Sequence, residues 1–387
     1  MSTPIYLDYA ATTPVDGRVL AVMGPYFSTN FGNPSSMHRA GQKAEAALES
    51  ARETIAQYLH CRPEEIVFTS GGSESDNLAL RGAALGMRAK TGARQILTSR
   101  VEHHAVSKTA EQLEKYYGFQ VGWLDVNEQG MVTPETVEKA IRPETGLVSL
   151  MLGNNEIGTI NPIREIADLC HRKGIVFHTD AVQAAAYLSV DVEELHVDLL
   201  SLGAHKLYGP KGVGALYARN GTHLEPSQTG GGQERGLRSG TQNVPYIVGF
   251  AEAFRLAGEE REHRSEHVRP LRDHIIGQVL ETIPDSRLTG HPSQRLPNHA
   301  SFVLRGVDGN LLLTLLDAAG FECSSGSACK TGNPEPSEVM LAIGLAREWG
   351  LGSLRVTLGV ETTAEEIRLF LDCLPDLVKK ARQLARN

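Results

Sequence analysis

The sequence predicts an α/β protein with two lobes, in which a mostly parallel sheet is covered by helices and a smaller lobe follows. From residue 65 onward, short apolar runs alternate with helical patterns. Strands that alternate with helices build a parallel sheet with helices on both faces. The chain has 387 residues, more than one hydrophobic core normally serves, so we expect two domains or one large and one small lobe.

The predicted strands are segments that are β-branched or apolar for most of their length. They cover residues 65–70, 95–99, 121–126, 146–152, 175–180 and 197–206. Helices are predicted between them over residues 105–117, 133–141 and 163–174, and the last ends on Gly174, a residue type that suits a helix C-terminus. Ligands of such sheets bind beyond the carboxyl ends of the strands, so we expect a site at that edge.

The second lobe is reached through a charged helical run at 255–275, which shows no core pattern and is predicted to connect the two lobes. Beyond it we expect strands at 300–306 and 353–359, a helix at 309–320 and a terminal helix that starts near residue 362. In that terminal helix, Thr363 and Glu366 have the spacing of a capping box.

Composition excludes several classes of protein. A formal charge of −8 and a pI near 6.0 give no basic footprint, so nucleic acid is not expected as a partner. No run approaches the ~18 apolar residues of a membrane span, and the first residues do not read as a signal peptide. The 5 cysteines contain no CxxC pair and the 14 histidines lack metal-ligand spacing. We therefore expect a cytoplasmic protein with free thiols and no membrane or structural metal site.

Three chemical features stand at the predicted strand ends. "GGSESDN" follows the first strand and opens a helix, and its free N–H groups suit a phosphate, although such a turn can also be only a tight turn. Asp180 ends another strand, where it can hold a ring nitrogen protonated or cap a helix. Lys206 ends a third strand, and a desolvated lysine there is suited to forming a Schiff base.

Together these features describe a pyridoxal phosphate site. A phosphate cup, a carboxylate for a pyridinium and a lysine for an aldehyde are what this cofactor needs. Asp180 and Lys206 are separated by one strand–helix unit, so two neighbouring strand ends could reach the same ring.

With these residues in view, the chain resembles the cysteine desulfurases of the NifS and IscS type, which are fold-type I pyridoxal phosphate enzymes of the class V aminotransferase group. The resemblance covers nearly the whole chain. Its motifs are "YLDYAATTP" (6–14), "NFGNPSSMH" (30–38), "TSGGSESDN" (69–77), "EHHAV" (102–106), "GNNEIG" (153–158), "HTDAVQ" (178–183), "AHKLYGPKG" (204–212), "GGGQERGLRSGT" (230–241), "SSGSAC" (324–329) and "RVTLG" (355–359).

The resemblance implies a domain plan. Residues 1–15 would pack near the small domain, and residues 16–258 would form the large cofactor-binding domain with a seven-stranded, mostly parallel sheet. Residues 259–387 would form a small α+β domain that carries a cysteine loop at about 323–337.

The resemblance also assigns roles to single residues. Lys206 would form the Schiff base and later remove the substrate Cα proton, and His103 would stack on the ring and shuttle protons, whereas His104 would be a surface residue. Other cofactor contacts would come from Gly72, Ser73, Asn155, Asp180, Gln183, Gly203 and His205, and from Thr241 of the other subunit of a homodimer. Asn155 and Arg355 would bind the substrate carboxylate, Arg355 with bidentate geometry.

Cys329 lies in "SSGSACKTGNP", among residues too small to pack, so the sequence predicts a mobile, exposed loop. By resemblance, its thiolate takes sulfur from L-cysteine as a persulfide, leaving alanine, and passes it to an acceptor such as an iron–sulfur scaffold protein. Neighbouring Lys330 would favour the thiolate. Cys329 could also ligate an iron–sulfur cluster transiently; no other metal ligand is expected.

Two departures and three alternatives accompany this hypothesis. Position 203 is Gly where many relatives have Ser, so one hydroxyl contact to the phosphate would be missing and cofactor retention weaker. Cys323 is expected to be inert, although it could resolve the persulfide; Cys61, Cys170 and Cys373 are expected to be packing residues.

The alternatives are a selenocysteine lyase or aminotransferase on the same fold, a nicotinamide-dependent dehydrogenase, and a non-enzymatic sulfur carrier. The dehydrogenase would need a G-x-G-x-x-G motif after the first strand, and this sequence has none there.

Overall fold

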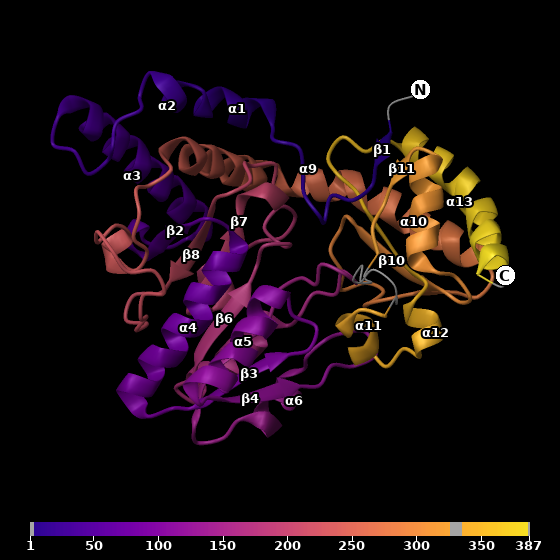
Figure 1. Cartoon of the computed structure of the whole chain (residues 1–387), viewed down its shortest axis with the longest axis horizontal. Coiled ribbons are helices and arrows are strands. Elements are labelled where there is room, and N and C mark those ends of the chain that lie inside the picture. Colours follow the sequence, from indigo (N-terminus) through magenta and orange to yellow (C-terminus); the bar gives the residue numbers. More distant parts are fainter. Residues whose placement is uncertain (1–3, 326–334, 386–387) are drawn as a thin grey trace.

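The centre of the molecule is a seven-stranded sheet with the order β2-β8-β7-β6-β5-β3-β4 (Figure 1). The computed structural model describes residues 4–325 and 335–385. All strands of the sheet run parallel except β8, which is antiparallel to both of its neighbours, so the predicted mostly parallel sheet is confirmed. The strands are β2 (Ile66–Thr69), β3 (Gln95–Ser99), β4 (Gln120–Leu124), β5 (Thr145–Ser149), β6 (Val176–Asp180), β7 (Leu199–Gly203) and β8 (Gly214–Ala218).

Helices cover both faces of this sheet, and alternate strand residues divide between them. Leu147, Leu199 and Leu216 pack in one apolar cluster with α4 and α5, while their neighbours in the strands pack in a second cluster with α3, α7 and α9. The helices of this region are α1 (Gly17–Met23), α2 (Pro25–Ser28), α3 (Arg39–Leu59), α4 (Gly72–Thr91), α5 (His104–Tyr117), α6 (Pro134–Ala140), α7 (Ile163–Arg172), α8 (Val192–Leu195) and α9 (Val244–Thr282).

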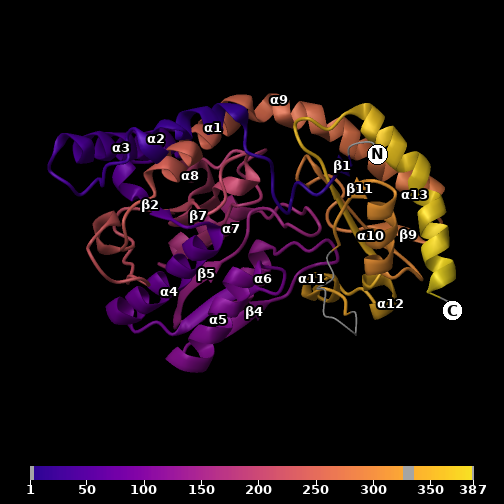
Figure 2. The ribbon, with the colours of Figure 1, turned by 45° about the horizontal axis from the view of Figure 1, so that its top comes forward.

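Helix α9 corrects one expectation. It is a single helix of 39 residues that runs from the large sheet to the second lobe (Figure 2). The connection was predicted, but its charged part does contribute to the core, since Val268 and Ile275 are fully buried. Arg264 and Arg272 are buried with them, because Arg264 pairs with Glu260 at 2.9 Å and Arg272 donates to a backbone carbonyl.

The second lobe is built on an antiparallel sheet of three strands with the order β12-β10-β9. The Thr363–Glu366 capping box predicted from the sequence is confirmed at the start of α13. The elements of this lobe are β9 (Ser286–Leu288), β10 (His299–Leu304), α10 (Gly309–Ala318), β11 (Phe321–Glu322), α11 (Glu338–Ala342), α12 (Arg347–Gly350), β12 (Ser353–Thr357) and α13 (Ala364–Leu384).

The N-terminal segment joins this lobe through strand pairing. Strand β1 (Ile5–Tyr6) runs parallel to β11, with Ile5 opposite Phe321. The chain then passes along the large sheet before α1 begins. The boundaries predicted for the domains stay a prediction. No helix in the part of the chain that the structure describes has the length and apolar character needed to cross a membrane.

Candidate active site

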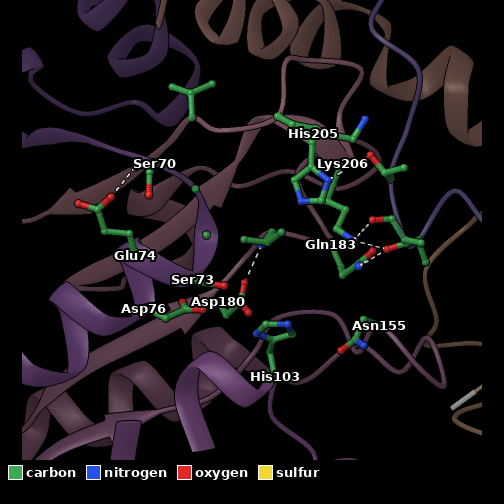
Figure 3. A pocket seen from close by; sticks show the side chains of 18 of the residues that line it. Ser70, Ser73, Glu74, Asp76, His103, Asn155, Asp180, Gln183, His205 and Lys206 are labelled. Atoms are coloured by element: carbon green, nitrogen blue, oxygen red, sulfur yellow. Dashed lines mark hydrogen bonds between the residues drawn. The ribbon is translucent and has the colours of Figure 1, made fainter. Parts of the chain in front are cut away.

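A cavity of about 550 Å³ opens at the carboxyl edge of the large sheet, where β6 and β7 end and α4 begins (Figure 3). The structure brings most of the predicted site residues to its walls. These are Gly72, Ser73, His103, Asn155, Asp180, Gln183, His205, Lys206 and Arg355. Gly203 and Thr241 are not among the residues that line it.

Lys206 projects into the cavity from a 3-10 turn, Ala204–Lys206, that follows β7 directly. Its Nζ donates hydrogen bonds to the carbonyl oxygens of Ala10 and Ala11, the latter at 2.7 Å, so its described hydrogen-bond partners are neutral. Burial, assisted by the nearby Arg355 charge, lowers the pKa of Lys206 to about 8. The amine therefore loses its proton far more readily than a solvated lysine.

Asp180 is the last residue of β6, and only 7% of it is exposed. Its Oδ1 accepts the backbone N–H of Val182 at 2.9 Å, in a turn rather than at the start of a helix. Burial raises the pKa of Asp180, while this N–H and the nearby His103 and Lys206 oppose the rise. The carboxyl group is thus positioned to receive a buried cation.

His103 is the N-cap residue of α5, and its Nδ1 accepts the N–H of Ala105 at 3.1 Å. The ring is open to solvent because it faces the cavity, but the surrounding protein still lowers its pKa. The neutral ring therefore carries its proton on Nε2. The neighbouring His104 is the first residue of α5 and is exposed.

The opposite end of the cavity is the amino terminus of α4. In the described part of the chain, no side chain caps this helix. Its first N–H groups therefore remain available to an anion. Gly72 is required there, because a Cβ at this position would lie 2.5 Å from the Val182 side chain. His205 also lines this end, and burial lowers its pKa to about 4. A Cβ at Gly203 would lie 3.3 Å from Gly72 N, so a serine side chain there would extend towards the same N–H groups.

Arg355 and Asn155 form the wall on the side of the second lobe. Arg355 Nη1 donates to the Asn155 carbonyl at 2.9 Å and Nη2 to Asp8 Oδ1 at 2.8 Å. Arg355 Nε is buried and has no partner among the described residues. The guanidinium is therefore held in place, and its Nε–H is left without a partner among the described residues.

The residues that sequence reasoning missed come mainly from the N-terminal segment. Ala10 O accepts from both Lys206 and Gln183, and Ala11 and Thr12 line the cavity beside it. Gln183, one of the predicted cofactor contacts, uses its amide nitrogen for this hydrogen bond. The only sequence signal is the run of small residues in "YAATTP". Glu74, Asp76, Met151 and Lys211 also line the cavity without having been singled out as site residues.

The cysteines divide into two groups. Cys329, with Lys330, lies outside the described residues. Cys61, Cys170, Cys323 and Cys373 are free, and all four pack in or against the main apolar cluster. Burial raises the pKa of Cys323 and so disfavours its thiolate, as expected of an inert thiol. Among residues 4–325 and 335–385, no group of three or more His, Cys, Asp or Glu side chains is arranged to hold a metal ion.

This donor set fits pyridoxal phosphate. A free helix N-terminus faces one end of the cavity, a buried carboxyl group lies at its floor, and an amine with a lowered pKa lies beside that carboxyl group. The three groups match the phosphate, the ring nitrogen and the aldehyde of the cofactor.

Comparison with known proteins gives consistent matches. The family model described as aminotransferase class-V matches residues 5–370. The cysteine desulfurase IscS of Clostridium botulinum is 46% identical over 387 residues, which are 100% of this chain and 97% of that protein. The IscS of Dictyoglomus turgidum is 46% identical over 385 residues, with the same coverage of both chains.

Solved structures resemble the chain as closely. A NifS-like protein superposes with a TM-score of 0.91 at 36% identity, covering 98% of this chain and 100% of that one. DndA from Streptomyces lividans superposes with a TM-score of 0.77 at 35% identity, covering 92% of this chain and 99% of its own.

Proposed function

This chain belongs to the aminotransferase class-V family and is a pyridoxal-phosphate-dependent cysteine desulfurase of fold type I, and from that premise we propose how its own residues carry out the reaction. The cavity beside Lys206 is the single observation that carries the assignment of roles. When bound, pyridoxal phosphate supplies an aldehyde for an amine and a ring that accepts electrons.

Three residues around the ring position would hold the cofactor. Lys206 would be its point of attachment, since its amine has a lowered pKa and faces the cavity. Asp180 would bind the ring nitrogen through a charge-assisted hydrogen bond. His103 would stack on the ring, with its Nε2–H available for proton transfer.

Phosphate binding would rely on the N-terminus of α4, with Gly72 and Ser73, and on His205. Neutral His205 can donate one hydrogen bond, and its Nδ1 lies 3.2 Å from Thr12 Oγ1. Gly203 would offer no side chain, so the backbone N–H groups of α4 would carry more of the interaction. We propose that cofactor retention is weaker for this reason.

The substrate carboxylate would bind at Arg355 and Asn155. Because Asp8 and the Asn155 carbonyl hold the guanidinium in place, its orientation is fixed before the substrate arrives. Lys206 lies across the cavity and would remove the substrate Cα proton.

Cys329 would receive the sulfur. Its thiolate would attack the substrate sulfur, the carbon–sulfur bond would break with its electron pair left on carbon, and proton transfer would complete L-alanine. The products would be L-alanine and a Cys329 persulfide, and the sulfur would pass to an acceptor such as an iron–sulfur scaffold protein. We place this activity in the cytoplasm, where the free thiols of the described residues would stay reduced.

The enzyme would work as a homodimer in which Thr241 reaches the partner's phosphate site. Thr241 is exposed and does not line the cavity of its own subunit. A second copy would also cover apolar side chains that are open to solvent between α1 and α3. They are Leu20, Phe27, Phe31 and Met37, which are 55%, 58%, 74% and 93% exposed.

A persulfide-trapping experiment tests the proposal. After addition of L-cysteine, an alkylating reagent should label the peptide that contains Cys329, and Cys329→Ala should lose both the label and sulfide release. Cys323→Ala is the matched control and should keep both, because Cys323 is a half-buried thiol whose pKa is raised. Sulfide release at the parent rate by Cys329→Ala would refute the carrier role and favour an aminotransferase-type reaction.

A further inference from the structure

Asp76 is a buried acid that the proposed reaction does not use. It lies in the first turns of α4, lines the floor of the cavity near Asp180, and is only 1% exposed (Figure 3). Its Oδ1 is buried and accepts no hydrogen bond among the described residues. Ionising a carboxyl group whose buried oxygen accepts no hydrogen bond costs desolvation free energy. The neutral acid is therefore the more stable form of Asp76 here.

The neighbouring Asp180 is much better prepared to carry a negative charge. It accepts the Val182 N–H at 2.9 Å and lies within the electrostatic influence of His103 and Lys206. Burial and the charge of Asp180 both raise the pKa of Asp76 well above its usual range. Two carboxyl groups at one buried site do not both ionise readily, and the proton resides on the less stabilised one.

Behind Asp76, a chain of neutral groups can receive a hydrogen bond from it. Asp76 contacts the Ser201 hydroxyl, whose Oγ lies 2.9 Å from His178 Nε2, and His178 Nδ1 lies 2.8 Å from Ser149 Oγ. His178 is fully buried and its pKa falls to about 3, so it supplies no cation to Asp76. A hydrogen bond from the Ser201 hydroxyl lowers the pKa of Asp76 and so opposes the effects of burial and of Asp180. With a proton on Asp76 the direction can reverse, so that Asp76 donates to Ser201, Ser201 to His178, and His178 to Ser149.

A third acid, Glu102, also disfavours the ionised form of Asp76 when it is itself charged. It is 6% exposed and accepts the Ser99 hydroxyl at 2.6 Å and the Met151 N–H at 2.9 Å. Both of its oxygens therefore accept a hydrogen bond, whereas Asp76 Oδ1 has no hydrogen-bond partner among the described residues. Burial raises the pKa of Glu102 itself to about 8, so the charge that it gains above that pH further raises the pKa of Asp76.

We propose that Asp76 and Asp180 share one proton and one negative charge, with the proton on Asp76 and the charge on Asp180. Asp76 would thus be a positioning residue: by staying neutral it leaves Asp180 as the ionised partner of the ring nitrogen. The inference rests on the proposed function, because it takes Asp180 as that partner.

Infrared spectroscopy of the holoenzyme tests where the proton resides. With ¹³C-labelled aspartate, the parent protein at neutral pH should show the carbonyl band of a protonated carboxylic acid, and Asp76→Asn should remove it. Absence of a protonated aspartate band from the parent protein would overturn the proposal, and this result does not depend on any variant folding.

A pH titration of the bound cofactor's absorbance gives a second readout. Asp76→Asn replaces a neutral acid by a neutral amide, so the midpoint should stay within about 0.3 pH unit of the parent value. A fall of about one unit or more would show that Asp76 carried the charge. Glu74→Gln is the matched positive control, because Glu74 faces the same cavity but is ion-paired with Arg238 at 2.8 Å; losing its charge should lower the midpoint.

Asp180→Asn separates this inference from the proposed function. If Asp180 binds the ring nitrogen, this variant should change the cofactor spectrum and weaken retention of the cofactor whatever the state of Asp76. An unchanged spectrum would refute the role of Asp180 in the proposed function, whereas a changed spectrum with no protonated Asp76 band would refute only the shared proton.

Discussion

The floor of the cavity and its outer wall are built in different ways. The floor consists of residues at the ends of adjacent parallel strands and the helix that follows one of them, such as Asp180, Lys206 and Gly72. The wall joins parts of the chain that are far apart in sequence, because Arg355 contacts Asp8 and Lys206 contacts Ala10. The floor therefore follows from local pattern and sheet topology, whereas the wall depends on how the two lobes and the N-terminal segment meet.

The largest effect should come from the floor. Lys206→Ala removes the amine that would attach the cofactor and move the substrate proton, so we expect sulfide release to fall by at least ~10³-fold. The absorbance of attached cofactor should also disappear. Retention of that absorbance band would show that attachment occurs elsewhere.

A change in the wall should instead act on substrate binding. Arg355→Ala removes the cation proposed for the substrate carboxylate, and we expect KM for L-cysteine to rise by roughly 10–100-fold. Because Arg355 is also tied to Asp8, Arg355→Lys is the comparison variant and should recover only part of the loss. Steady-state kinetics of both variants measure this change. An unchanged KM would contradict the assignment of Arg355 to the substrate carboxylate.

The state of Lys206 should appear in the stability of the cofactor-free protein. Its pKa is about 8 in the folded state against an ordinary value of 10.5. Between these values the unfolded chain binds more protons, so this group makes the free energy of unfolding rise with pH across that window. Urea denaturation of the parent and of Lys206→Met should show a shallower rise in the variant; equal slopes would mean that Lys206 is not desolvated.

Asp8 in the outer wall influences Lys206 in the floor of the cavity. Asp8→Asn should therefore change the pKa of Lys206, but by less than the effects above. The Asp8 charge raises the pKa of Lys206 and the Arg355 charge lowers it. Removing Asp8 should therefore lower the pKa of Lys206 below about 8, by roughly 0.5 unit. The pH dependence of cofactor capture by the cofactor-free protein measures the change. Asp16→Asn is the control, because Asp16 caps α1 and is not among the residues that line the cavity. An upward shift would contradict the proposed coupling.

The smallest effect should arise away from both regions. Thr363 Oγ1 accepts the N–H of Glu366 at 3.2 Å at the start of α13. Thr363→Ala should lower the free energy of unfolding by about 1 kcal/mol and leave the kinetics unchanged. Thr363→Ser keeps a hydroxyl and should restore most of the stability, as measured by urea denaturation.

The sequence predicted best where short-range pattern decides the structure. Six strands of the large sheet, the Thr363 cap and the position of Asp180 at a strand end all follow from apolar runs and their ends. The strand predicted to reach Lys206 was too long, because β7 ends at Gly203 and Lys206 follows in a 3-10 turn. Strand β8 escaped prediction, because its five residues follow a Gly- and Pro-rich turn and carry little pattern of their own. The two-residue strands β1 and β11 form only by pairing with each other, so no local signal marks them.

Sequence reasoning failed where burial of polar groups depends on tertiary contacts. The charged part of α9 looked exposed, but Arg264 and Arg272 are buried, where Arg264 pairs with Glu260 one turn away and Arg272 donates to the Leu296 carbonyl. Asp76 gave no signal within "GGSESDN", since only the packing of α4 against β6 and β7 places it near Asp180. Likewise, small residues at 10 and 11 show nothing of the carbonyl groups that hold Lys206.

The pairing of β1 with β11 has a consequence for how the protein matures during synthesis. Residues 5 and 6 are synthesised more than 300 residues before their partners at 321 and 322. In a nascent chain that has made the whole large sheet but not β11, strand β1 has no partner. The N-terminal segment is then not fixed in place, so the carbonyl groups of Ala10 and Ala11 cannot yet hold Lys206. We therefore expect the protein to capture the vitamin-derived group only after β11 has been made and has paired with β1.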